Sequence, residues 1–173
     1  MKKTVLFALL SFLCVFANAA DIKIIFGSVS VLKEKAKAVV EYDYSSTRWE
    51  DDEDFKTWCG EDYQKRKDAI SNAFMSSFNE NSKGIVLSTN PNESKYKFVL
   101  NIKNLERHQS FTGMWGQGKI SVTGTLNIID ISNNNSVCTI EIDGYGDGKD
   151  FDITDGMAKC FKGLAKAILK IKK

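Results

Sequence analysis

Residues 95–103, KYKFVLNIK, form the clearest strand pattern in the chain. Apolar and polar side chains alternate there, with Tyr96, Phe98, Leu100 and Ile102 on one face and Lys95, Lys97, Asn101 and Lys103 on the other. This period of two predicts a strand with one face on a core and the other in water. Residues 120–131 repeat the pattern, but its phase flips at Ile129, which predicts a β-bulge near Ile128.

Further elements extend outward from this pair of strands. A turn at Ser132–Asn135 returns the chain into a strand over 137–142, and weaker strand patterns cover 21–33, 35–44 and 85–88. Apolar residues recur at helical spacing over 61–79 and again over 157–169, and Asp152 or Thr154 can cap the second helix. The sequence therefore predicts an α+β fold, with a mainly antiparallel sheet of about five to six strands and both helices on one face.

The first twenty residues have the order of a secretory signal peptide. Lys2 and Lys3 precede an apolar run over 5–16, and Ala17-Asn18-Ala19 fits a small-residue cleavage site. Leu13 precedes Cys14, where a lipoprotein cleavage box needs a small residue. We therefore expect residues 1–20 to be a signal peptide and residues 21–173 to be a single exported domain, periplasmic or secreted, with no transmembrane segment.

Charge argues against a nucleic-acid partner. The full chain has 24 basic and 22 acidic residues, and the predicted signal peptide holds two of the lysines, so the mature chain has 22 of each. The charges are segregated, because residues 41–62 hold nine acids against Arg48 and Lys56, whereas residues 156–173 hold six lysines and no acid. Such segregation either steers a partner or marks solvated surfaces.

The cysteines and aspartates give no metal pattern. Cys59, Cys138 and Cys160 remain after cleavage, so at most one internal disulfide can form, and their spacing matches no zinc site. The segment 143–155 places aspartates among glycines, as a calcium loop does, but Tyr145 stands at the third ligand position and Thr154 replaces the bidentate Glu of the twelfth. We expect no metal and no other cofactor, and interpret 143–155 as a glycine-rich strand end followed by a helix cap.

The candidate binding residues are Phe111, Met114 and Trp115, in the segment 110–118 between the two long strands. Exposed at a hairpin end, these three side chains would form a contact patch for another envelope protein or a glycan. The competing interpretation is that they fold back over the end of the sheet.

No catalytic constellation appears in the sequence. His108 is the only histidine, and Glu106 would share its face of a strand, but no Ser, Cys or acid completes a recognisable motif, so we interpret it as a solvated strand-end residue. The alternative is a hydrolase or enzyme inhibitor that uses the acidic segment around residues 50–62, with Trp49, Trp58, Asp51, Asp52 and Asp54. A deep cleft holding a carboxylate of raised pKa would favour that alternative.

The order of the strands at 96–102, 120–131 and 137–142 before a closing lysine-rich helix resembles small exported domains of the bacterial cell envelope, of uncharacterised families. It is loosely similar to the curli-secretion lipoprotein and to the N-terminal domain of the Tol-system propeller protein. The resemblance covers residues 36–172 by element order and carries over no functional residue. Together with export, it implies a non-catalytic binding or accessory module of the envelope, of unknown oligomeric state.

The signal-peptide interpretation predicts a mature protein that begins at Ala20 or Asp21 and carries no lipid. N-terminal sequencing and mass measurement of the exported protein test this. An acylated cysteine at the new N-terminus would contradict it.

Overall fold

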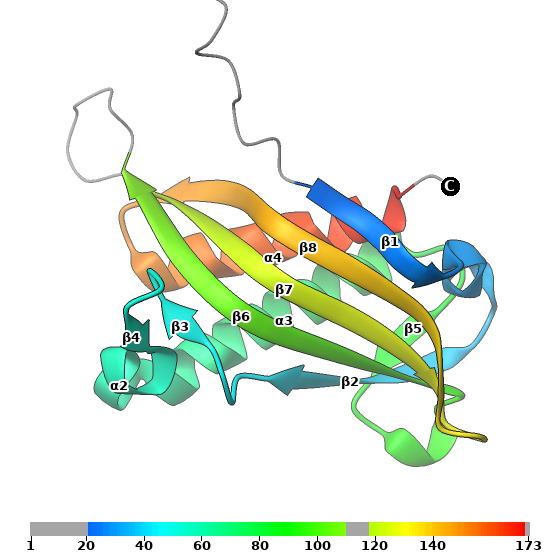
Figure 1. The fold of residues 1–173 in the computed structure, drawn as a ribbon. Coiled ribbons are helices and arrows are strands. Elements are labelled where there is room, and N and C mark those ends of the chain that lie inside the picture. The colour runs from blue at the N-terminus through cyan, green and yellow to red at the C-terminus, as the bar shows by residue number, and fades with distance from the viewer. Residues whose placement is uncertain (1–20, 110–117, 172–173) are drawn as a thin grey trace, which may run out of the picture.

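The computed structural model describes residues 21–109 and 118–171. One mixed sheet of eight strands lies against two long helices, both on the same face of the sheet (Figure 1). The predicted α+β class and the placement of both helices on one face are confirmed. The predicted number of strands was too low, since the acidic segment adds two short strands to the sheet.

The elements follow one another in a single continuous order: β1 (Asp21–Gly27), the 3-10 helix η1 (Val29–Lys33), β2 (Lys37–Asp43), β3 (Arg48–Trp49), β4 (Glu53–Asp54), α2 (Phe55–Cys59), η2 (Gly60–Asp62), α3 (Tyr63–Asn81), β5 (Val86–Ser88), η3 (Pro91–Glu93), β6 (Tyr96–Gln109), β7 (Gly118–Asp130), β8 (Asn135–Asp150) and α4 (Ile153–Leu169).

The sheet is less antiparallel than the sequence predicted. Its main order is β1-β8-β7-β6-β2-β5, and from β1 to β6 each strand is antiparallel to its neighbour, as expected for a meander. β2, however, runs parallel to both β5 and β6. The reason is α3, which follows the acidic segment and carries the chain back along the sheet, so that β5 starts from the same end as β2.

Register shifts set the phase of the central strands. The register of β7 against β8 shifts between Ile128 and Ile129, at the level of the sheet where the sequence predicted a bulge. The extra residue is Val137 on β8, however, and β7 stays in continuous register with β6, so the predicted change of phase within 120–131 was wrong. The register of β6 against β7 also shifts between Ile102 and Asn104. Beyond this second bulge Leu105 is fully buried. Because side chains alternate along a strand, the neighbouring Asn104 and Glu106 then lie on the face that has no helix.

The helix-covered face holds the core. α3 buries Ile70, Phe74 and Phe78, and α4 buries an apolar stripe that includes Phe161 and Leu164. Ser77 on α3 donates a hydrogen bond to the carbonyl of Lys162 on α4 at 2.8 Å, which ties the two helices together. Within the described residues, no helix is both long enough and apolar enough to cross a membrane.

Asp152 caps α4, as the sequence predicted. Its Oδ1 accepts hydrogen bonds from the backbone N–H groups of Thr154 at 2.7 Å and Asp155 at 3.1 Å. These bonds favour the carboxylate and hold the pKa of Asp152 below its usual value.

The three described cysteines are all buried free thiols. The internal disulfide that the sequence allowed is therefore not formed among them. Burial raises the pKa of Cys59, Cys138 and Cys160. All three therefore remain protonated, which argues against a nucleophilic thiolate.

Replacing core residues of the helices tests this assignment of faces. Phe74→Ala and Leu164→Ala should each lower the free energy of unfolding by about 2 to 5 kcal/mol, because each leaves a cavity against the sheet. Lys162→Ala, on the exposed side of α4, should change it by less than about 0.5 kcal/mol. Urea denaturation measures all three, and equal losses for Leu164 and Lys162 would show that the helix face is assigned wrongly.

Candidate functional site

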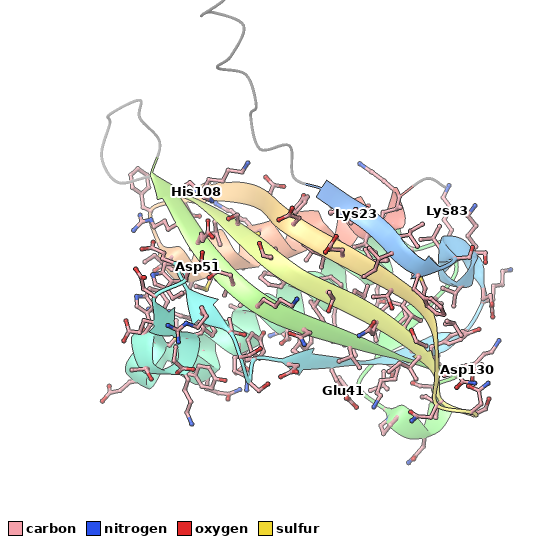
Figure 2. All side chains as sticks on the ribbon, in the orientation of Figure 1. Lys23, Glu41, Asp51, Lys83, His108 and Asp130 are labelled. Atoms are coloured by element: carbon pink, nitrogen blue, oxygen red, sulfur yellow. The ribbon has the colours of Figure 1, made fainter. Side chains whose placement is uncertain are left out.

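The helix-free face of the sheet carries a polar groove near the end of β6. Two hollows of about 510 and 490 Å³ adjoin there, and both are lined by Glu106 and Thr123. Asp51 and His108 lie toward the same end of the molecule (Figure 2). We call this feature the outer groove; its lining residues are Ser46, Arg48, Asp51, Lys103, Asn104, Glu106, His108, Lys119, Ser121, Thr123, Asp143, Gly144 and Gly146.

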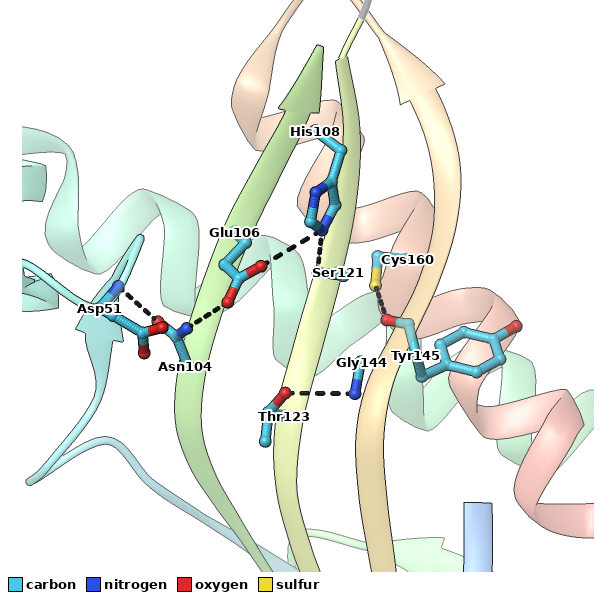
Figure 3. Close-up of polar contacts among 9 residues, drawn as sticks. All are labelled: Asp51, Asn104, Glu106, His108, Ser121, Thr123, Gly144, Tyr145 and Cys160. Carbon is cyan, nitrogen blue, oxygen red and sulfur yellow. Dashed lines mark hydrogen bonds and ion pairs between the residues drawn. The ribbon is translucent and has the colours of Figure 1, made fainter. Parts of the chain in front are cut away.

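A chain of polar contacts crosses the floor of the outer groove (Figure 3). The backbone N–H of Asp51 donates to Oδ1 of Asn104 at 3.1 Å, and Nδ2 of Asn104 donates to Oε1 of Glu106 at 2.6 Å. Nε2 of His108 lies 3.3 Å from Oε2 of Glu106 and 2.7 Å from Oγ of Ser121. The Glu106 carboxylate is thus held between an amide and an imidazole, in a fixed orientation.

His108, Ser121 and Glu106 do not form a catalytic triad. In a triad, the acid contacts one imidazole nitrogen and the serine the other, so that the acid orients the base. Here both the carboxylate and the hydroxyl contact the same nitrogen, Nε2. The arrangement gives polar recognition groups and no activated nucleophile.

The sequence placed Glu106 and His108 on one strand face but missed Ser121 and Asn104. Ser121 comes from β7 and lies directly opposite Glu106 in the sheet. That pairing depends on the register after the bulge at Lys103, which the sequence analysis did not identify. A signal was present, because the core residues Ile102 and Leu105 are three positions apart, where an unbroken strand spaces them by two or four.

One wall of the first hollow is a tight turn between β3 and β4. Glu50 and Asp51 both have positive φ angles, 54° and 61°, which are costly for residues with a Cβ atom. Two hydrogen bonds fasten this turn to β6: Glu50 N–H donates to the carbonyl of Leu105 at 2.8 Å, and Asp51 N–H donates to Asn104. Strain of this kind persists where surrounding contacts fix the backbone, and it gathers at functional sites.

Glycines keep the second hollow open. The N–H of Gly144, which has a φ of 60°, donates to Oγ1 of Thr123 at 3.2 Å. A Cβ atom at Gly146 would lie 2.7 Å from Cε of Lys119, so a larger residue would displace that side chain. The glycine-rich strand end predicted from the sequence therefore forms part of β8 and of the groove floor.

Two of the aspartates of 143–155 serve separate structural roles. Asp150 pairs with Lys159, and Asp152 caps α4. In the described part of the chain, no three His, Cys, Asp or Glu side chains gather in a way that could hold a metal ion.

The acidic segment is used mainly for packing. The rings of Trp49 and Trp58 stack with centroids 3.8 Å apart, and the guanidinium of Arg66 lies 4.3 Å from the centre of the Trp58 ring. Asp54 caps α2 by accepting from the N–H of Thr57 at 2.8 Å, and this bond lowers its pKa. A catalytic acid needs the opposite shift, so the Asp54 carboxylate does not suit the hydrolase interpretation.

The predicted binding residues Phe111, Met114 and Trp115 lie outside the described residues. The segment that contains them joins Gln109 to Gly118, which face each other at the ends of β6 and β7. The groove residues His108 and Lys119 are the next pair along these strands. The role of the three apolar residues stays a prediction.

Comparison with known proteins gives fold likenesses alone. No family model and no curated protein matches this chain. Among solved structures, a PelC dodecamer from Paraburkholderia phytofirmans aligns with a TM-score of 0.48 and 13% identity, over 86% of this chain and 96% of that one. A protein of family DUF330 from Xanthomonas campestris aligns with a TM-score of 0.46 and 10% identity, over 87% and 90% of the two chains.

A putative neuraminyllactose-binding hemagglutinin homolog from Helicobacter pylori aligns with a TM-score of 0.38 and 11% identity, over 86% of this chain and 92% of that one. At TM-scores of 0.38 to 0.48, these likenesses carry no argument about the ligand, assembly or activity of this chain. The resemblance to curli-secretion and Tol domains stays a hypothesis.

The tether between Asn104 and the strained turn can be tested by amide hydrogen exchange. Asn104→Ala removes the acceptor of the Asp51 N–H, so exchange at Asp51 should accelerate about tenfold, as the loss of one hydrogen bond implies. The Glu50 amide is an internal control, because its acceptor is the backbone carbonyl of Leu105. Unchanged exchange at Asp51 would show that the side chain of Asn104 does not hold the turn.

Proposed function

We propose that this protein is an exported, non-catalytic binding module of the bacterial cell envelope, and that the outer groove binds a hydroxyl-rich ligand, a glycan. The observation that carries the proposal is the fixed row of contacts from Asp51 through Asn104 and Glu106 to His108 and Ser121. A site whose polar groups are already oriented loses little entropy when a ligand binds.

The chemistry of the groove suits sugar hydroxyls. A hydroxyl both donates and accepts hydrogen bonds, and the groove offers carboxylate acceptors beside amide and hydroxyl groups. Its charged residues have both signs, with Arg48, Lys103 and Lys119 near Asp51, Glu106 and Asp143. This balance favours a ligand that is polar over one that is strongly charged, such as a nucleic acid.

Phe111, Met114 and Trp115 complete the proposal. A sugar ring presents an apolar face as well as hydroxyls, and an aromatic side chain at the end of the groove would contact that face. The segment that carries these residues leaves β6 directly after Gln109, beside the groove residue His108.

The alternative function, a hydrolase or inhibitor acting through residues 50–62, draws less support. Of its aspartates, Asp54 caps α2 with a lowered pKa, and only Asp51 lines the groove. Trp49 is buried and stacks on Trp58, and the guanidinium of Arg66 lies over the Trp58 ring, so this pair offers a ligand little ring surface.

Binding of defined tetrasaccharides to the mature protein tests the proposal, with neutral, N-acetylated and acidic examples titrated by calorimetry. Glu106→Gln should weaken binding of the recognised sugar by at least about tenfold, because hydrogen bonds to a charged group are lost. Glu141→Gln is the matched control, since Glu141 is also on the helix-free face, is similarly exposed, and lies outside the groove. The Glu141→Gln variant should bind the recognised sugar with unchanged affinity.

Trp115→Ala in the same titration tests the apolar contact. It should weaken binding while leaving the melting temperature nearly unchanged. Equal losses of sugar affinity for Glu106→Gln and Glu141→Gln would contradict the assignment of the binding site to the outer groove. A large loss of stability for Trp115→Ala would show that this tryptophan is part of the core. Release of cleaved sugar during the titration would favour the hydrolase.

A further inference from the structure

A third hollow lies at the other end of the molecule, away from the outer groove. It has a volume of about 490 Å³ and forms where η1, the end of α3 and the end of α4 meet. Lys83, on its rim, lies at the end of the molecule opposite Asp51 and His108 (Figure 2). We call it the end hollow; its apolar lining is Val29, Leu32, Leu169 and Ile171, and its rim includes Lys33 and Lys83.

Several polar groups beside the end hollow bond within the chain. Asn81, which also lines it, donates through Nδ2 to the carbonyl of Ser77 at 2.8 Å. Amides just beyond the two helices also bond within the chain, Ser82 N–H to the carbonyl of Phe78 and Ile171 N–H to that of Ile168. The end hollow therefore differs from the outer groove: it presents hydrocarbon and offers few oriented polar partners.

Positive charge surrounds this apolar surface. Lys33 and Lys83 are exposed, and neither takes part in an ion pair within the described residues. Lys170, which lies between the lining residues Leu169 and Ile171 in the sequence, is also exposed. The neighbouring acid Glu34 is occupied, because it pairs with Lys95 at 2.7 Å and accepts from the Tyr96 hydroxyl at 2.7 Å.

The two helix ends at this site weakly disfavour the binding of an anion. The C-termini of α3 and α4 carry partial negative charge, and lysines near them also have a structural role in offsetting it. This effect falls off within the last turn and is screened by solvent. Full ammonium charges on flexible stems reach beyond it, and their stems can lie along apolar surface while the charged heads stay in water.

From this combination we propose that the end hollow binds a single-chain anionic amphiphile, with the acyl chain against Val29, Leu32, Leu169 and Ile171 and the anionic head beside Lys33 and Lys83. An apolar hollow rimmed by cations is complementary to a molecule that joins a hydrocarbon chain to one negative group. This site is separate from the outer groove, so the proposal does not depend on the proposed function.

Dodecanoate, used below its critical micelle concentration, is the probe. Calorimetric titration of the mature protein should show one saturable site. Decanoate has two fewer methylenes and should bind about fifteenfold more weakly, since each buried methylene is worth about fourfold in affinity. Dodecyltrimethylammonium, with the same chain and the opposite charge, should not compete.

Charge-reversal and polar variants assign the site. Lys33→Glu with Lys83→Glu should weaken dodecanoate binding by about tenfold, whereas Lys56→Glu with Lys162→Glu, which reverses two exposed lysines elsewhere, should not. Ile171→Ser should weaken binding, and Ile131→Ser, which alters an apolar residue that is 42% exposed outside the hollow, should not.

Three results would overturn the proposal: no saturable binding of dodecanoate, equal binding of the cationic amphiphile, or equal effects of the two lysine pairs. A protein that binds phosphatidylglycerol vesicles but no monomeric dodecanoate would also overturn it, because that result indicates attachment to a bilayer surface in place of a single-chain site.

Discussion

The bulge in β6 at Lys103 is the constraint on which the candidate site depends. Because side chains alternate along a strand, a shift of one residue exchanges the two faces for everything that follows. The shift between Ile102 and Asn104 turns Leu105 into the core and puts Glu106 and His108 on the helix-free face. Without it, a carboxylate and an imidazole would point at the helices, where burying a charge without a partner is costly.

Gly124 makes this bulge possible. It lies opposite Ile102, where the register of β7 against β8 shifts as well. A Cβ atom at this position would lie 2.2 Å from the carbonyl oxygen of Asn101, a separation that no side chain tolerates. The close approach of β6 and β7 at this point, and hence the phase of the groove residues, requires glycine. The two faces of the sheet then serve different purposes: the helix-covered face holds the core, and the helix-free face carries the polar groove.

The sequence predicted those features that depend on local periodicity. The stripe of Ile70, Phe74 and Phe78, the cap at Asp152 and the meander all appear in the structure. The predicted bulge near Ile128 appears as a register shift whose extra residue is on the partner strand β8. Features that depend on distant pairing were missed. The parallel placement of β2 follows from the path of α3, and the contact between His108 and Ser121 follows from cross-strand register. The spacing of Ile102 and Leu105 is local and could have revealed the second bulge.

An amide chemical-shift map of the ¹⁵N-labelled mature protein, recorded with the recognised oligosaccharide, tests the central claim most directly: that the polar face created by this bulge is the ligand-binding face. The account predicts that the largest shifts fall on Asn104, Glu106, Ser121, Thr123 and Gly144, whereas Glu141 and Thr125 on the same face outside the groove stay unchanged. Shifts confined to α3, α4 or the β5 edge, with the groove amides unmoved, would contradict it.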